Sequence, residues 1–332
     1  MSEPTISVVM PTYNEAEYVE RAVASIRAQT FSDFEIVVVD DGSTDGTVEL
    51  VQAFEDDRIR VVRREGETGI TSALNRGVGE SSGRYVARHD ADDWSHPKRF
   101  ERQVEVLEAR PELALLGTGA YLVDATGDTI GRRRVLERPG LRDLLEHNEF
   151  VHGSVVMNRE ALQSVGGYDE WFETTEDYDL WIRLAEEYPV GNVDEPLYYF
   201  RQHDESIYGS DLERLKLYHV VAARRATDEG FPALRRRIET DGIEVVAEDL
   251  TGDERAWLEA ELAREFLRYG DLEASRKRSR RAIAARPTGA MLYPMYALSY
   301  TTPGVARSAA RAYRRVLNAS IRIRNWRRPI DG

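Results

Sequence analysis

Short apolar runs alternate with helical patterns over the first part of the chain. Ile6–Met10, Phe34–Val39 and Tyr85–Ala87 are largely apolar and β-branched, as expected for strands buried on both faces. Apolar residues recur at helical spacing between them, over Tyr18–Ile26 and Thr47–Phe54. Strands that alternate with helices of about ten residues predict βαβ units and a mainly parallel sheet.

The same patterns predict further elements along the chain. These are strands at Ile59–Val62, Leu113–Leu116, Ala120–Val123, Phe150–Met157 and Leu197–Arg201, and helices at Gly69–Val78, Pro97–Ala109 and Arg159–Val165. Strand signals stop beyond Ser210, and helical patterns cover Leu212–Asp228, Asp253–Tyr269 and Leu272–Ala285. We therefore expect an α/β domain over residues 1–209 and a helical region over 210–332.

Composition agrees with a globular protein, since hydrophobic residues make up 42% of the chain and charged residues 31%. The absence of cysteine excludes disulfides and thiolate metal sites. The sequence has neither a long apolar run nor a basic N-terminal segment followed by an apolar one. We therefore expect no transmembrane helix and no signal peptide, and a cytoplasmic location.

Charge is distributed unevenly along the chain, whose formal net charge is −14. Residues 275–330 hold 14 of the 45 Lys and Arg residues and none of the 59 Asp and Glu residues. Tyr293, Tyr296 and Tyr300 lie among these basic residues, which predicts a helical surface that meets the inner face of an anionic cell membrane. The alternative is a basic surface that pairs with the acidic remainder of the chain. No zinc spacing or aromatic ribonucleoprotein pattern supports binding of nucleic acid.

An acidic turn follows the strand at Tyr85–Ala87, where Asp90, Asp92 and Asp93 occur within four residues. The carboxyl ends of strands are where open α/β sheets place their ligands. Clustered carboxylates repel one another, and Mg²⁺ relieves this by binding one or two of them together with substrate phosphates. A metal–diphosphate site is one interpretation, and a solvated acidic turn before a helix is the other.

Two more acidic segments need a choice between interpretations. Asp41–Gly46 resembles the start of a calcium loop, but Gln52 occupies the position where a bidentate Glu is required, so we reject that reading. No glycine-rich phosphate loop follows the first strand, so any nucleotide must be bound by side chains at strand ends. Thr175 could cap a helix whose first turn holds Glu176, Asp177 and Asp179, acids that could serve only the helix dipole.

Taken in order, four segments resemble the family-two glycosyltransferases. These are Ser7–Glu15, Val39–Thr47, Asp90–Asp93 and Glu176–Trp181. The resemblance covers roughly residues 4 to 205 and leaves the helical C-terminal region uncovered. It implies the GT-A fold, which is an α/β, Rossmann-like, mostly parallel sheet with helices on both faces.

The resemblance also implies an enzyme that transfers sugar from a nucleotide-sugar donor, with inversion. Asp177 falls at the position of the catalytic base, Asp92 would hold Mn²⁺ or Mg²⁺, and His203 would give a further metal contact. The donor-binding residues that it implies are Pro11, Thr12, Tyr13, Glu15, Asp41, Asn75, Arg76, Asp90, Ala91 and Asp92. Because the carboxylate of Asp41 could accept a hydrogen bond from a uracil N–H, a UDP-sugar is the expected donor.

The expected acceptor is a hydroxyl of a lipid-linked, glycan or protein-glycan molecule. Two alternatives remain, a sugar-phosphate nucleotidyltransferase and a non-catalytic nucleotide-sugar-binding scaffold. The first lacks the glycine-rich opening loop, which is replaced by Pro11–Asn14. The second does not explain the presence of acidic residues at positions 90, 92 and 177.

Overall fold

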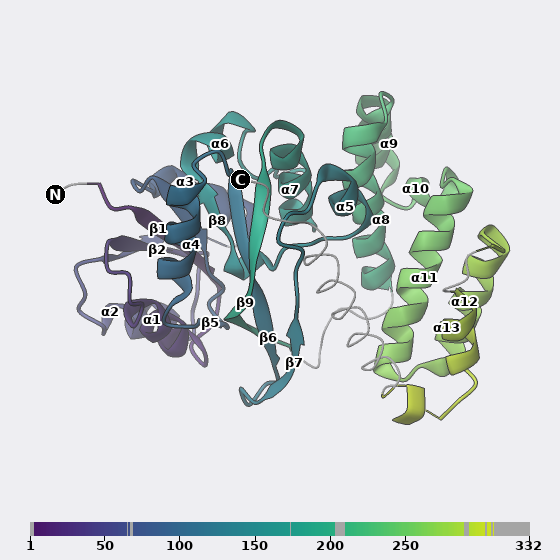
Figure 1. Ribbon diagram of the computed structural model, residues 1–332, viewed down its shortest axis with the longest axis horizontal. Helices are drawn as coiled ribbons and strands as arrows, with labels where there is room; N and C mark the ends of the chain where they lie inside the picture. Colours follow the sequence, from purple (N-terminus) through teal and green to yellow (C-terminus); the bar gives the residue numbers. More distant parts are fainter. Residues whose placement is uncertain are drawn as a thin grey trace. The chain divides into compact units, whose positions relative to one another are not determined.

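The computed structural model describes residues 3–64, 66, 69–172, 174–202, 210–288, 292–302, 304–306 and 308. The described residues divide into two compact units, one before and one after residue 204. The described residues up to 202 form an α/β unit, and those from 210 onward form a helical unit. Each is treated separately below (Figure 1).

The α/β unit is built on one nine-stranded sheet, in the order β3-β2-β1-β4-β8-β6-β9-β5, with β7 paired to β6. Its first half consists of β1 (Ile6–Thr12), β2 (Phe34–Asp40), β3 (Ile59–Arg63) and β4 (Tyr85–Arg88). All pairings within this half are parallel, as the apolar runs predict. The carboxyl ends of β1, β2 and β4 therefore lie at the same edge.

Helices cover both faces of this parallel half, namely α1 (Val19–Arg27), α2 (Thr47–Gln52), α3 (Ile70–Glu80) and α4 (Arg99–Ala109). Successive side chains of a strand point to opposite faces. Val8 and Val38 accordingly pack in a core that includes Val23 of α1 and Phe100 of α4. Val39 packs on the other face against Ala73 of α3.

The second half of the sheet is mixed. It contains β5 (Trp94–Ser95), β6 (Leu115–Val123), β7 (Thr129–Arg133), β8 (Val156–Asn158) and β9 (Val190–Arg201). Strand β8 pairs antiparallel with both β4 and β6, whereas β6 and β9 are parallel. The connecting helices are α5 (Leu141–Glu146), the 3₁₀ turn η1 (His152–Ser154), α6 (Arg159–Ser164) and α7 (Glu176–Glu187).

Three predicted strands differ from the observed ones. The runs Leu113–Leu116 and Ala120–Val123 belong largely to one continuous strand, because β6 passes through Gly117–Gly119 with irregular pairing to β9. Only the end of Phe150–Met157 is a strand. Residues 152–154 turn instead, because Gly153 packs directly against Asp90 and Tyr198.

The helical unit consists of α8 (Ser210–Thr227), α9 (Phe231–Asp241), α10 (Val245–Glu248), α11 (Gly252–Tyr269), α12 (Leu272–Ala285) and α13 (Leu292–Leu298). Gly270 ends α11 in the left-handed conformation, and Asp271 then caps α12. The apolar patterns predicted α8, α11 and α12, but not the polar helix α9 or the short α10. Among the residues that the structure describes, no helix combines the length and apolarity needed to span a bilayer.

Candidate active site

The loops that follow β1 and β2 are hydrogen-bonded to one another. The Asn14 N–H donates to Ser43 Oγ at 2.9 Å, and the Thr44 N–H donates back to Asn14 Oδ1 at 2.9 Å. The Glu15 N–H donates to Thr47 Oγ1 at 2.8 Å. Asn14 has φ of 55°, a left-handed conformation that asparagine tolerates better than most residues. The two loops thus form one rigid edge at the carboxyl end of the sheet.

This edge brings together the residues expected to receive the nucleobase. Thr12 is buried, and its hydroxyl has no hydrogen-bond partner among the described residues. Tyr13 is 44% exposed at the rim. The carboxylate of Asp41 accepts the Gly69 N–H at 2.9 Å and lies 3.5 Å from Arg64 Nη1. Pro11 lies in β1, Glu15 lies in the loop after β1, and Ala91 lies in the turn after β4.

Asn75 and Arg76, also expected to bind the donor, have other contacts. Asn75 Nδ2 donates to the Tyr168 carbonyl at 2.8 Å, and Asn75 Oδ1 accepts the Tyr168 N–H at 3.0 Å. Arg76 is exposed and paired with Glu80, one turn further along α3, at 2.7 Å. The side chain of Asn75 therefore links α3 to the segment before α7 by hydrogen bonds. Arg76 lies on the outer surface of α3.

The three acids of the turn after β4 have different surroundings. Asp90 forms an ion pair at 2.5 Å with the buried Arg88, and its side chain is 25% exposed. Asp93 is buried and accepts the Arg201 N–H at 2.6 Å. Arg201 Nε donates to the Asp92 carbonyl at 2.9 Å, which holds the backbone of the turn.

The surroundings of Asp90 and Asp93 raise the pKa of the two carboxyl groups to different extents. Burial raises the pKa of Asp90, and the ion pair with Arg88 opposes this rise. Burial, together with the charges of Asp90 and Asp92, raises the pKa of Asp93 well above its ordinary value. Asp93 therefore has a structural role inside the turn, whereas Asp92 is only partly buried.

A network of buried polar side chains stabilises the strand and segments around the acidic turn. Arg99 donates through Nη2 to the Arg88 carbonyl at 2.9 Å and through Nη1 to Ser95 Oγ at 3.0 Å. Its Nε donates to Gln103 Oε1 at 3.1 Å, and Gln103 Nε2 donates to the Ser154 carbonyl at 2.9 Å. Burial lowers the pKa of Arg99 to about 10, so it stays charged at neutral pH. Sequence reasoning missed this network, whose signal is the i, i+4, i+8 spacing of Ser95, Arg99 and Gln103.

Gly153 of η1 lies against the acidic turn. A Cβ placed on Gly153 would lie 2.5 Å from Asp90 Oδ2 and would collide with the hydroxyl of Tyr198. That hydroxyl accepts the Asp90 N–H at 3.1 Å. Only glycine leaves room for the carboxylate and the phenol at this position.

The start of α7 carries the expected base. Asp177 Oδ1 accepts the Tyr178 N–H at 2.7 Å, and Asp177 Oδ2 accepts Asn148 Nδ2 at 3.2 Å. Burial raises the pKa of Asp177, while these two hydrogen bonds act in the opposite direction. Burial and the charge of Asp177 raise the pKa of the neighbouring Glu176 to about 7. Asp179 instead forms a buried ion pair with Arg183 at 2.8 Å, which is a structural role.

The residue before α7 adopts a strained conformation. Thr175 occupies the N-cap position, as predicted, but its φ is 69° and its side chain makes no capping hydrogen bond to the described residues. A β-branched residue in this left-handed region is unusual and costs of order 1–3 kcal/mol. Such strain is found where the surrounding structure must hold a functional group in one orientation.

The acids at the sheet edge suit a metal that is shared with a substrate. The described residues contain no group of three or more His, Asp or Glu residues that could hold a metal ion by themselves. His203, the expected second metal contact, lies outside the described residues. Mg²⁺ in phosphate sites typically takes one or two carboxylates and completes its shell with phosphate oxygens and water. Asp92 beside Asp90 fits that donor set.

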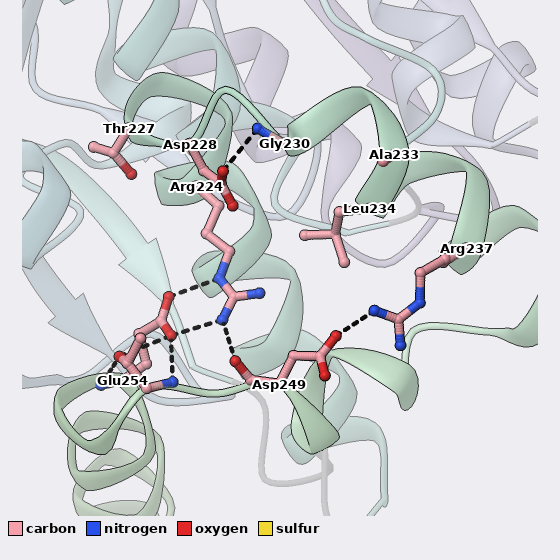
Figure 2. A pocket seen from close by; sticks show the side chains of 10 residues that line it. Arg224, Thr227, Asp228, Gly230, Ala233, Leu234, Arg237, Asp249 and Glu254 are labelled. Carbon is pink, nitrogen blue, oxygen red and sulfur yellow. Dashed lines mark hydrogen bonds and ion pairs between the residues drawn. The ribbon is translucent and has the colours of Figure 1, made fainter.

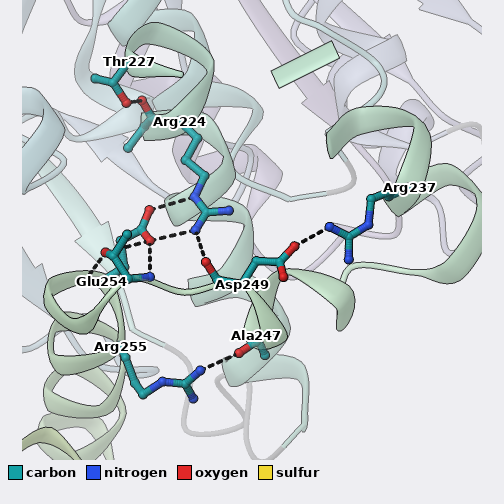
Figure 3. Close-up of polar contacts among 9 residues, drawn as sticks. Arg224, Thr227, Arg237, Ala247, Asp249, Glu254 and Arg255 are labelled. Atoms are coloured by element: carbon teal, nitrogen blue, oxygen red, sulfur yellow. Dashed lines mark hydrogen bonds and ion pairs between the residues drawn. The ribbon is translucent and has the colours of Figure 1, made fainter. Parts of the chain in front are cut away.

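A separate hollow of about 490 Å³ lies in the helical unit, lined by residues of α8, α9 and α11 and the segments between them (Figure 2). Arg224 binds Glu254 through two hydrogen bonds of 2.7 Å and donates to the Asp249 carbonyl at 3.0 Å (Figure 3). Arg237 pairs with the Asp249 carboxylate. These opposite charges pair with one another, so this network holds α8 and α11 to the α10 segment and does not form a second charged site.

Sequence relatives of the chain are glycosyltransferases. Residues 7–166 match the family model described as glycosyl transferase family 2. The uncharacterized glycosyltransferase MJ1057 of Methanocaldococcus jannaschii is 31% identical over 227 residues, which cover 66% of this chain and 78% of MJ1057. EpsE of Bacillus subtilis, whose glycosyltransferase assignment is provisional, is 32% identical over 173 residues, and the chain spans 61% of its length.

Solved structures show the same fold. TarS 1–349 of S. aureus, in complex with UDP-GlcNAc, superposes with a TM-score of 0.57 at 18% identity, covering 94% of this chain and 92% of TarS. The mannosyltransferase PcManGT of Pyrobaculum calidifontis, in complex with GDP-Man and Mn²⁺, gives 0.53 at 20% identity, with 96% and 88% covered. The expected GT-A fold, followed by a helical C-terminal region, is confirmed. The chain belongs to glycosyltransferase family 2.

Proposed function

We propose that this glycosyltransferase moves a sugar from a UDP-sugar to a hydroxyl of a lipid-linked, glycan or protein-glycan acceptor, with inversion. One observation carries the proposal. The adjacent residues His152 and Gly153 contact the two acidic centres, since Gly153 packs on Asp90 and His152 Nδ1 lies 3.9 Å from Glu176 Oε1. Two consecutive residues of η1 therefore link the acidic turn to the start of α7, the helix that carries the expected base.

The joined loops after β1 and β2 receive the nucleobase in this proposal. Asp41 accepts the uracil N–H, while the Gly69 N–H and Arg64 hold its carboxylate in place. Thr12 and Tyr13 line the same end of β1. Structural neighbours have been solved with UDP-GlcNAc and with GDP-Man, so a GDP-sugar is the competing donor.

Asp92 would hold Mn²⁺ or Mg²⁺, with His203 as a second ligand. Bound metal neutralises charge on the departing diphosphate, an effect of several kcal/mol. The ion pair with Arg88 favours the ionised form of Asp90 and fixes its carboxylate, and Arg201 holds the Asp92 backbone. The role of the chain here is to present carboxylates that do not need to move when the donor binds.

Asp177 takes the proton from the acceptor hydroxyl. A positioned carboxylate used in this way typically raises the rate about 10² to 10⁴-fold. One base acting on the face opposite the leaving group gives inversion by a single displacement, as in the inverting glycosidases. The hydrogen bonds from Tyr178 and Asn148 favour the ionised form that this role requires.

Donor binding tests the proposal. Calorimetric titration with UDP, GDP, UDP-GlcNAc and GDP-Man, with and without Mn²⁺, should show metal-dependent binding of the uridine compounds. Asp92→Ala should weaken that binding about tenfold or more, equivalent to about 1.4 kcal/mol. Asp57→Ala removes the same charge from an exposed position before β3 and should bind like the wild type. Absence of nucleotide binding in every condition would contradict the proposed donor site.

The basic C-terminal part of the chain supports contact with a membrane. On α12, Arg278 pairs with Glu213 at 2.5 Å and Glu259 at 3.3 Å, so some of the basic residues do pair with acids. Arg280 instead donates to the hydroxyls of Tyr296 and Tyr300 at 2.9 Å each, and Tyr300 is 54% exposed. We infer that this arginine–tyrosine surface meets anionic headgroups, with the rings at the interface.

Flotation with vesicles tests this surface. The wild type should float with vesicles that contain phosphatidylglycerol and not with neutral phosphatidylcholine vesicles. The pair Lys277→Gln and Arg280→Gln should reduce flotation, since each basic residue near the surface contributes about 1 kcal/mol. The pair Lys98→Gln and Arg142→Gln removes equal charge from exposed positions of the α/β unit and should float like the wild type. Equal flotation of both double variants would exclude this surface.

A further inference from the structure

Asn148 lies in the segment between α5 and η1, and both ends of its side-chain amide are engaged. Its Oδ1 accepts the Phe150 N–H at 3.1 Å, and its Nδ2 donates to Asp177 Oδ2 at 3.2 Å. Because the oxygen faces a backbone N–H, the amide nitrogen must face the carboxylate. The orientation of the amide is thus set by the backbone of its own segment.

Arg133, at the end of β7, clamps this segment. Its Nη2 donates to the Asn148 carbonyl at 2.8 Å and to the Phe150 carbonyl at 2.7 Å. The Phe150 ring packs against Trp181 of α7, with centroids 5.7 Å apart. The segment is therefore held by β7 on one side and packed against the helix of Asp177 on the other.

We propose that Asn148, clamped by Arg133, is the positioning residue for the Asp177 carboxylate; this rests on the proposed role of Asp177 as base. With the Tyr178 N–H on one oxygen and the Asn148 amide on the other, the carboxylate has a donor on each side and cannot rotate freely. Each carboxylate oxygen then keeps a lone pair whose direction is fixed by the two donors, and an acceptor hydroxyl must approach one of these.

Charged groups from several elements act on Asp177. Arg133 of β7 and Arg88 of β4 favour its ionised form, whereas burial opposes it. Glu176, on the same helix, and Tyr168, in the segment before it, are also coupled to the charge of Asp177. Among the described residues, neither arginine forms a hydrogen bond with Asp177, so the Asn148 amide is the side-chain donor that both orients the carboxylate and lowers its pKa.

The test is the pH dependence of turnover, measured as UDP release from UDP-GlcNAc with water as the acceptor. The base must be ionised, so the rate falls as pH drops through the pKa of Asp177. Asn148→Ala removes a hydrogen bond to the ionised form, and the acidic limb of the profile should move to higher pH by about one unit. Asn148→Asp has the same shape but adds a like charge, and should move the limb further in the same direction.

Matched variants on β7 test the clamp. Arg133→Lys cannot span both carbonyls, so its kcat should fall while the KM for the donor stays unchanged. Arg132→Lys alters the neighbouring residue, whose guanidinium lies over the ring of Tyr121 at 4.8 Å, and should behave like the wild type. UDP binding with wild-type affinity shows that a variant is folded. If Asn148→Ala fails that check, the isosteric Asn148→Asp serves as the test.

The outcomes separate this inference from the proposed function. Asp177→Asn with wild-type turnover would remove the base itself. An inactive Asp177→Asn, together with profiles for both Asn148 variants that superpose on the wild type, would overturn only the positioning role. An acidic limb that shifts in the Asn148 variants and not in Arg132→Lys would establish it.

Discussion

Replacing Gly153 with alanine should reduce sugar transfer at least about a hundredfold, because displacement of a reacting group by about 1 Å can have that effect. The added methyl would lie 2.5 Å from Asp90 Oδ2 and would collide with the hydroxyl of Tyr198. Since Tyr198 and Arg88 also hold Asp90, the turn that presents Asp92 must shift with it. Steady-state release of UDP from UDP-GlcNAc measures the effect.

The control for this substitution is Gly79→Ala. Gly79 lies in α3, where an added Cβ would meet no atom within 4 Å. Alanine should be tolerated there and should stabilise the helix by about 0.5–1 kcal/mol. Wild-type turnover by Gly153→Ala would show that the turn can move without loss of the site, and would contradict the arrangement proposed for Asp90 and Asp92.

Asp177→Asn should lower turnover about 10² to 10⁴-fold, because the amide cannot accept the acceptor's proton. The substitution keeps the shape of the side chain, so UDP binding measured by calorimetry should remain at wild-type strength. Single-turnover release of UDP from UDP-GlcNAc distinguishes loss of chemistry from slow release of product.

Glu187→Gln is the matched control, since it makes the same chemical change at an exposed position on the last turn of the same helix. It should leave both turnover and binding unchanged. Retained activity in Asp177→Asn would point to Glu176, whose pKa of about 7 also suits a base near neutral pH. Glu176→Gln would then show the loss expected of Asp177→Asn.

The parallel half of the sheet was predictable because its strands are buried on both faces. Such strands read as continuous apolar runs, and Ile6–Met10 and Phe34–Val39 lie within β1 and β2. The turn at His152–Ser154 was not predictable in the same way. Its residues are mostly apolar or small, and only contact with Asp90 and Tyr198, far away in sequence, requires the turn.

The acids of the candidate site were visible in the sequence because clustered carboxylates are unusual. Their supports were not, since Arg88, Arg99 and Asn148 look like ordinary surface residues when read singly. Their partners include backbone carbonyls and carboxylates contributed by other elements of the fold. Arg76, expected to bind the donor, is exposed on α3 and pairs with Glu80, and its contact with the donor stays a prediction.

The joined loops after β1 and β2 have a consequence for how donor specificity can change. Ordering a flexible residue costs about 1–2 kcal/mol of conformational entropy, and here folding has already met that cost through the bonds of Asn14 and Thr47. Donor binding then needs little rearrangement of this edge. A new nucleobase preference could therefore evolve through single exchanges at positions such as Thr12, Tyr13 or Asp41, without rebuilding the loops that carry them.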